Sequence, residues 1–169
     1  WSLGFVVATP RYPFALQAGS TAALTPQAAM LVSELEALAV AERLAGRDWY
    51  GPTMGAQATR SGAVITVPFT AMGNLVLRDP TNHGFAVDGV INGATVSSVA
   101  VNGKNVLITM SAAPAGTLTV RYAWGETGDR GDGYPANRGA LTDSWAQTSR
   151  MVSGATLYRY ARAGRALVV

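Results

Sequence analysis

The stretch Ala23-Leu24-Thr25-Pro26-Gln27-Ala28-Ala29 decides how this chain of 169 residues is organised, because it has the features of a helix entry. Thr25 is a good N-cap, since its hydroxyl can accept hydrogen bonds from the free amides of the first turn. Pro26 then stands at the first helical position, where its fixed φ suits the helix and its missing N–H is not needed. We predict a helix that begins here and is stopped by Gly46 at a C′ position. The apolar residues that follow at helical spacing are Leu31, Leu35 and Leu38.

The segment before this helix reads as part of an α/β unit. Gly4-Phe5-Val6-Val7-Ala8 is a short apolar run, typical of a buried parallel strand. Pro10 and Pro13 then prevent ladder pairing, so the chain continues as a loop. Strand, loop and helix in this order are typical of the last unit of a doubly wound sheet. We therefore predict that residues 1–48 form the C-terminal end of an α/β domain.

The pattern from Trp49 onward is that of β structure. Asn102-Gly103-Lys104 is a strong hairpin signal, and Ser61-Gly62 is a second one. Strands at this spacing predict an antiparallel sandwich or jelly roll over residues 49–145, followed by a basic strand or tail over residues 146–169. The fold class is therefore an α/β fragment followed by a mainly β domain. The strand-like segments are 56–60, 63–69, 74–78, 84–87, 94–101, 105–110, 117–124 and 156–161, and a long loop spans 125–140.

Composition sets further limits. A hydrophobic content of 49% with 14% charged residues can supply a core, and 19 glycines with eight prolines favour many turns. The absence of cysteine excludes disulfides and thiolate metal sites. No run of about twenty apolar residues occurs, so we expect no membrane-spanning helix and no membrane partner. The chain begins Trp1-Ser2-Leu3 without a methionine or a basic leader, so we expect a piece of a longer protein.

The net charge of +3 comes almost entirely from arginine, because Lys104 is the only lysine. No acidic residue follows Asp143. Such a basic end could meet phosphates, acidic glycans or an acidic partner subunit, or it could be a solvated strand face. No basic patch with interleaved aromatic residues stands out, so we expect no nucleic-acid partner. The arginines that accumulate there are Arg150, Arg159, Arg162 and Arg165.

Several stretches together resemble a known family. The chain is similar to the β-domain of the sialate O-acetylesterase branch of the SGNH hydrolases, and its entry segments are similar to phage-borne members of that family. The stretches that carry this resemblance are Trp49-Tyr50-Gly51-Pro52, Gly84-Phe85-Ala86-Val87, Val120-Arg121-Tyr122-Ala123-Trp124 and Leu141-Thr142-Asp143-Ser144-Trp145, with Val7-Ala8-Thr9-Pro10-Arg11-Tyr12 and Leu24-Thr25-Pro26 at the entry.

The resemblance implies a serine hydrolase that removes O-acetyl groups from sugars, with its nucleophile upstream of this chain. In the family an Asp-x-x-His-Leu-Thr segment supplies the orienting acid and the base. Aligned on Leu24-Thr25, this sequence has Ser20 at the acid position and Ala23 at the histidine position. A methyl group cannot deprotonate a serine hydroxyl, so the segment is degenerate and we predict no catalytic residue within this chain.

Other candidates for chemistry are weaker. His83 is the only histidine and lies in a predicted loop, where a surface or hydrogen-bonded role is more usual than that of a base. With one histidine and no cysteine, the chain has few side chains that bind metal ions, so we expect no metal site and no cofactor. Glu126, Asp129 and Asp132 could ligate calcium, but their spacing does not match an EF-hand loop.

Two surface hypotheses remain. Arg130-Gly131-Asp132 spells an adhesion tripeptide, although glycine and aspartate also simply belong in turns. Aromatic and carboxylate side chains could line a sugar-binding surface, and the candidates are Trp49, Tyr50, Asp132 and Tyr134. The alternative places large aromatic residues in the core or at an interdomain seam. We expect the core for Trp124 and Trp145, and leave both readings open for Trp49 and Tyr50.

These observations favour a non-catalytic, esterase-like module that recognises carbohydrate or serves as structure. The resemblance places it in a phage-like fibre or spike, outside the cell or on a virion surface. Its expected partners are cell-surface polysaccharide or O-acetylated glycan, further copies of the chain, or other virion subunits. The alternatives are the C-terminal part of an active carbohydrate O-acetylesterase and a purely architectural β-sandwich.

Overall fold

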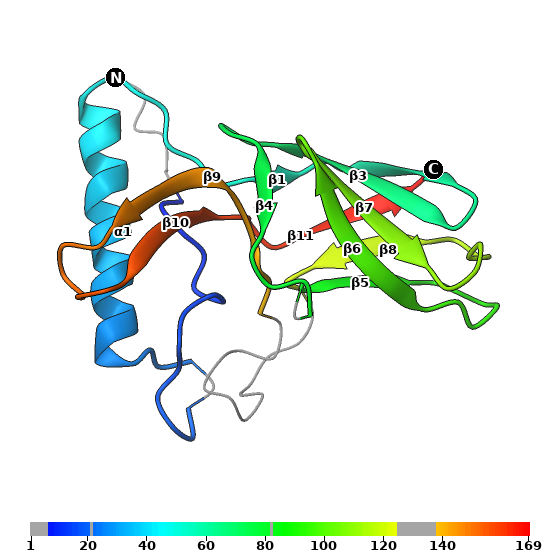
Figure 1. Ribbon diagram of the computed structural model, residues 1–169, viewed down its shortest axis with the longest axis horizontal. Coiled ribbons are helices and arrows are strands. Elements are labelled where there is room, and N and C mark those ends of the chain that lie inside the picture. Colours follow the sequence, from blue (N-terminus) through cyan, green and yellow to red (C-terminus); the bar gives the residue numbers. More distant parts are fainter. Residues whose placement is uncertain (1–6, 21, 82, 125–137) are drawn as a thin grey trace.

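The computed structural model describes residues 7–20, 22–81, 83–124 and 138–169. Within these ranges the chain forms one α-helix and eleven β-strands, in the order helix first and strands after (Figure 1). The elements are α1 Pro26–Leu44, β1 Thr53–Met54, β2 Gln57–Ser61, β3 Val64–Thr70, β4 Leu75–Leu77, β5 Phe85–Asp88, β6 Val96–Asn102, β7 Asn105–Met110, β8 Thr119–Tyr122, β9 Leu141–Thr148, β10 Thr156–Tyr160 and β11 Gly164–Val168.

Helix α1 begins and ends where its sequence signals predict. The Thr25 hydroxyl accepts a hydrogen bond from the Ala28 amide at 3.2 Å, and Pro26 occupies the first helical position. At the other end Gly46 has φ +73°, and its amide bonds to the Arg43 carbonyl. The Arg47 amide bonds to the Glu42 carbonyl at 2.9 Å, which completes a Schellman motif. Both predicted ends of the helix are therefore confirmed.

The larger sheet has eight strands in the order β5-β8-β11-β2-β3-β7-β6, with β1 paired to β3. Its two edge strands, β5 and β6, approach each other, so the sheet curls into a near-barrel (Figure 1). Pairing is antiparallel except between β11 and β2, which run parallel. The antiparallel domain was predicted over residues 49–145, and the parallel pair arises because the segment after it returns to insert β11 between β8 and β2.

The smaller sheet has the order β10-β9-β4, and it lies against the helix (Figure 1). Leu35 of α1 is fully buried, and Val32 beside it packs into the same cluster as Leu157 of β10. Phe14 and Trp49 complete this second core, separate from the core inside the large sheet. Of the three leucines predicted at helical spacing, only Leu35 is fully buried, and Leu31 and Leu38 are half-buried at the edge of this second core.

A chain of hydrogen bonds through two buried tyrosines joins distant segments. The Leu141 amide donates to the Tyr122 hydroxyl at 2.9 Å, and the Tyr122 and Tyr12 oxygens lie 2.8 Å apart. The Tyr12 hydroxyl donates to the Ala161 carbonyl at 2.5 Å, so the Tyr122 proton is directed to the Tyr12 oxygen. Burial, foremost, raises the pKa of both phenols above the ordinary value. The segment before α1 is therefore fixed to both sheets.

The structure confirms that the chain is mainly β, with the predicted hairpins at Gly62 and Gly103, both of which have positive φ. It does not confirm an α/β fragment attached to a separate sandwich. Residues 4–6 lie outside the described part, and Val7 and Ala8 belong to no strand. Strands β9 and β11 were not predicted. The domain boundaries after residues 48 and 145 stay predictions.

Candidate functional site

The loop before α1 holds the two positions where the resemblance would place a catalytic acid and base. The Ser20 hydroxyl accepts hydrogen bonds from the Ala23 amide at 2.8 Å and from the Ala22 amide at 3.2 Å. Ser20 therefore acts as a turn-forming residue, and the methyl group of Ala23 is exposed. Neither side chain can move a proton from a serine nucleophile.

His83 is half-buried beside the start of β5. Its Nδ1 accepts a hydrogen bond from the Phe85 amide at 2.9 Å, and its ring lies 6.1 Å from the Phe85 ring. Burial lowers the pKa of His83, against a smaller opposing effect of Asp79. Within the described residues, no hydrogen bond joins this ring to a serine, threonine or tyrosine hydroxyl. The imidazole therefore caps a strand and lacks the geometry of a general base.

Of the four residues predicted to line a sugar-binding surface, the structure describes two, Trp49 and Tyr50. Trp49 is only 5% exposed, and its ring packs edge-on to Trp145 with centroids 5.1 Å apart. The alternative that places Trp49 in the core therefore fits its position, and Tyr50 is half-buried. Asp132 and Tyr134 lie outside the described residues, as do the tripeptide Arg130-Gly131-Asp132 and the calcium candidates Glu126 and Asp129.

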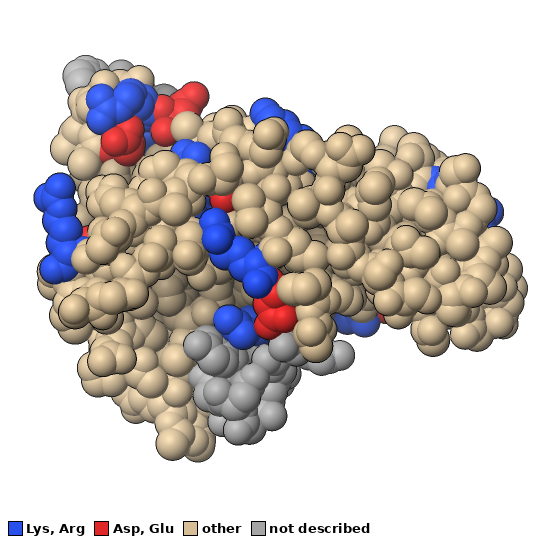
Figure 2. All heavy atoms as spheres, in the orientation of Figure 1, with Lys and Arg blue, Asp and Glu red and all other residues tan. Residues whose placement is uncertain are grey.

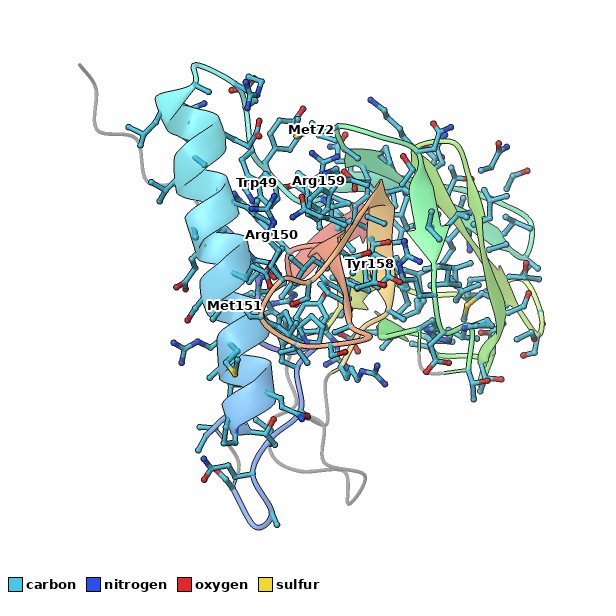
Figure 3. All side chains as sticks on the ribbon, turned by 60° about the vertical axis from the view of Figure 1, so that its left-hand side comes forward. Trp49, Met72, Arg150, Met151, Tyr158 and Arg159 are labelled. Carbon is cyan, nitrogen blue, oxygen red and sulfur yellow. The ribbon has the colours of Figure 1, made fainter. Side chains whose placement is uncertain are left out.

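Next to Trp49, a buried ion pair joins β9 to β10. Arg159 Nη2 lies 2.8 Å from Asp143 Oδ2, and Arg159 Nε donates to Asp143 Oδ1 at 3.2 Å. The guanidinium lies 5.7 Å from the Trp49 ring and 5.5 Å from the Trp145 ring, and it donates to Met72 Sδ. Figure 3 shows Trp49 and Arg159 between the helix and the sheets. Because the two charges neutralise each other in a buried position, this cluster is structural.

A hollow of about 470 Å³ lies between α1 and the turn that joins β9 to β10. Its Glu34 carboxylate accepts from the Ser149 hydroxyl at 2.5 Å and from the Arg150 amide at 2.7 Å. Arg150 and Met151 lie beside the helix in Figure 3. Glu34 therefore fastens the turn to the helix. The other lining residues are Ser33, Ala37, Leu38, Ala41 and Gln147.

The outward side of β5 and β8 carries a different arrangement. Arg121 Nε lies 2.6 Å from Asp88 Oδ2, and Arg121 Nη1 donates to the Trp124 carbonyl at 3.1 Å. Trp124 is 50% exposed, so the prediction that it lies in the core is wrong. The reason is Ala123, which has φ +47° and is the one non-glycine residue with positive φ in the described ranges. This backbone reversal ends β8 and turns the next residue out of the sheet.

Ala123 itself is held in this conformation from both sides. Its side chain is 2% exposed, and its amide donates to the Gly84 carbonyl at 2.9 Å. Gly84 must be glycine, because a Cβ there would lie 2.5 Å from Gly139 Cα at a φ of +78°. A residue such as alanine at positive φ is sparsely populated and persists only where neighbours enforce it. Sequence reasoning missed this feature, because alanine gives no signal for a left-handed conformation.

Metal sites and membrane spans are not supported by the described residues. In those ranges no three histidine, cysteine, aspartate or glutamate side chains gather where a metal ion could be held. The one helix described falls short of the length and apolarity that a membrane crossing needs. On the face seen in Figure 2 most side chains are uncharged, and charged ones gather in a group at the upper left and in a band across the middle.

The chain shows little similarity to known proteins. No family model matches the chain, and no curated protein matches it. Among solved structures, it is similar to a carbohydrate acetylesterase from Xanthomonas citri, with 22% identity and a TM-score of 0.42 over 68% of this chain. The chain spans 28% of the length of that enzyme. A similarity of this degree assigns no site or activity.

Proposed function

We propose that the chain is a non-catalytic carbohydrate-recognition module. Its binding face is the outward side of β5, β8 and β11, at the end marked by Trp124. The observation that carries this proposal is the half-exposed indole of Trp124 on a backbone fixed by Ala123 and by the hydrogen bond from Arg121. A rigid, exposed aromatic face can stack on the apolar face of a sugar ring at little entropic cost. Carbohydrate as the ligand class rests on the family resemblance and on this indole.

The absence of catalysis is supported by the state of the candidate residues. Ser20 is occupied with backbone amides, Ala23 has no ionisable group, and Nδ1 of His83 accepts from the Phe85 amide. General base catalysis needs a basic side chain, most often an imidazole, within hydrogen-bond reach of the nucleophile, and its loss costs orders of magnitude in rate. A frame related to an esterase can therefore retain sugar binding without the reaction.

The test is binding of the chain to a panel of immobilised oligosaccharides. We expect specific binding that Trp124→Ala weakens about tenfold or more, the effect of about 1.4 kcal/mol of lost stacking. Trp124→Tyr retains part of it, and Leu44→Ala, which trims an 82% exposed side chain of α1, has no effect. Binding to no glycan, together with a defined oligomer, would instead indicate an architectural module.

A second measurement separates recognition from catalysis. The chain is incubated with 4-nitrophenyl acetate and with O-acetylated oligosaccharides, and acetate release is followed. We expect no release above the protein-free rate, and no change in the His83→Ala variant. Acetate release that disappears in His83→Ala would contradict the non-catalytic proposal and favour an esterase with an unorthodox base.

We also propose that the module acts outside the cell, as part of a fibre or spike that meets cell-surface polysaccharide. The resemblance to phage-borne proteins supports this setting. Immunogold labelling of particles with antibodies against the chain tests it, and labelling confined to the interior of producing cells would contradict it.

A further inference from the structure

Two arginines face each other across the sheet beside Trp124. In the antiparallel pairing of β8 and β11, Arg165 is the direct partner of Arg121. Ala166 and Val120 point inward and are buried, so their neighbours Arg165 and Arg121 lie on the outward side. Side chains of directly opposed residues lie about 5 Å apart at Cβ, and like charges there destabilise the sheet.

The two charges are compensated unequally. Arg121 has Asp88 at 2.6 Å and bonds to the Trp124 carbonyl. Arg165 is exposed, and in the described ranges no acidic side chain forms an ion pair with it. Among the described ion pairs, Arg165 thus lacks the kind of acidic partner that Arg121 has in Asp88 and Arg159 has in Asp143.

We infer that the ligand of this face is an anionic glycan. Its carboxylate, phosphate ester or sulfate ester lies between Arg165 and Arg121, while a ring of the same glycan stacks on Trp124. An oxyanion there neutralises the charge of Arg165, as Asp88 neutralises that of Arg121, and accepts charge-assisted hydrogen bonds from Arg165. This inference rests on the proposed function and adds the chemical class of the ligand. Asp88, in turn, keeps Arg121 oriented while the anion pairs with Arg165.

The test compares sugars that share one ring and differ in the neutral or anionic group at C6. Glucose, glucuronate, glucose 6-phosphate and glucose 6-sulfate are each titrated into the isotopically labelled chain, and binding is followed by NMR. Matched neutral and charged oligosaccharides are compared on the immobilised panel. We expect the charged forms to bind about tenfold tighter or more, and Arg165→Gln to abolish this preference. Arg165→Lys retains part of it. Arg11→Gln, an equal change of charge at an exposed arginine elsewhere, leaves it intact. Inorganic phosphate is the probe for the charge alone.

The outcomes separate this inference from the proposed function. Trp124-dependent binding with equal affinity for neutral and charged sugars overturns the inference and leaves carbohydrate recognition standing. Charged sugars that bind no tighter to the original chain than to Arg165→Gln also overturn it. Binding of phosphate and charged sugars that depends on Arg165 but not on Trp124 shows an anion site and contradicts recognition of the sugar ring. A preference that rising salt concentration removes for the original chain supports the inference.

Discussion

Arg159 and Asp143 meet in a buried two-point ion pair, with Nη2 and Oδ2 2.8 Å apart and Nε and Oδ1 3.2 Å apart. Asp143 is fully buried and Arg159 is 8% exposed. The Trp145 amide donates to the same carboxylate at 3.0 Å. The pair thus fixes the register of β9 against β10 at the point where both meet the helix-side core.

Removing one partner of this ion pair should strongly destabilise the folded chain. Because Arg159→Ala leaves an uncompensated buried carboxylate, we expect a loss of about 3 to 5 kcal/mol in the free energy of unfolding. Urea unfolding measures it. The double variant Asp143→Leu, Arg159→Met should recover much of the loss, since neither charge remains buried alone. Arg11→Ala, at an exposed arginine, is the control and should change stability by less than about 0.5 kcal/mol.

Glu34 should make the stability of the chain depend on acidic pH. Burial raises its pKa, but hydrogen bonds from Ser149, Arg150 and Met151 outweigh this effect, so the pKa lies below its ordinary 4.5. The folded state therefore binds this proton less readily than the unfolded state. The contribution is present above pH 4.5 and is lost as the pH falls through the folded pKa.

The variant Glu34→Gln tests this expectation. At pH 7 it should lower the free energy of unfolding by about 1 kcal/mol, since the group lies near the surface and its hydrogen bonds are only weakened. At pH 3 this difference should be smaller than at pH 7, because the contribution of the ionised carboxylate is lost as the pH falls. Glu36→Gln, on the exposed face of the same helix, is the control. An equal difference at both pH values would contradict the assignment.

The buried pair Tyr12 and Tyr122 should make the stability of the chain depend on alkaline pH. Burial holds the pKa of Tyr12 and of Tyr122 above the ordinary 10.0. The unfolded chain releases these protons first, so stability is fully present below pH 10 and falls as the pH rises toward the folded values. Ultraviolet titration should show these two phenols ionising together with unfolding.

Substitution of Tyr12 tests the hydrogen-bond chain itself. Tyr12→Phe removes the donor to the Ala161 carbonyl and the acceptor of the Tyr122 proton, so we expect a loss of about 2 kcal/mol. Tyr158→Phe, on a half-buried tyrosine stacked under Arg78, is the control, with little expected effect. Equal stability of the two variants would contradict a stabilising role of the Tyr12 hydrogen bonds.

Gly51 should tolerate no side chain. A Cβ at this position would lie 2.1 Å from the Tyr160 carbonyl oxygen, which belongs to the backbone of β10. We expect Gly51→Ala to cost about 3 kcal/mol, because the strand itself must shift. Gly93→Ala is the comparison: the added methyl meets open space, and only the positive φ costs about 1 kcal/mol. Thermal unfolding should show that Gly51→Ala is less stable than Gly93→Ala.

Prediction from the sequence succeeded where the signal is local. Thr25, Pro26 and Gly46 act within one helical turn, and Gly62 and Gly103 within one hairpin, so these elements are confirmed. Strand β9 was missed because a charged residue at its centre suggests a loop. Asp143 is buried there only because Arg159 comes from another strand to neutralise it, and no local pattern shows that partner.

The candidate site depends still more on distant relationships. The outward position of Trp124 follows from the left-handed backbone of Ala123, which Gly84 and its neighbours impose across the sheet. The opposition of Arg121 and Arg165 follows from the register of β8 on β11. A sequence shows that both arginines exist, but the pairing partner of a strand is set by the whole topology.

The place of β11 in the order of the large sheet has a consequence for how the protein is made. Synthesis reaches residues 164–168 after every other strand described here, yet these residues hold β8 and β2 together. While the ribosome still holds them, the sheet remains in two parts with apolar edges uncovered. Closure of the barrel therefore follows the emergence of this segment, and it is a late step that leaves strand edges unpaired until then.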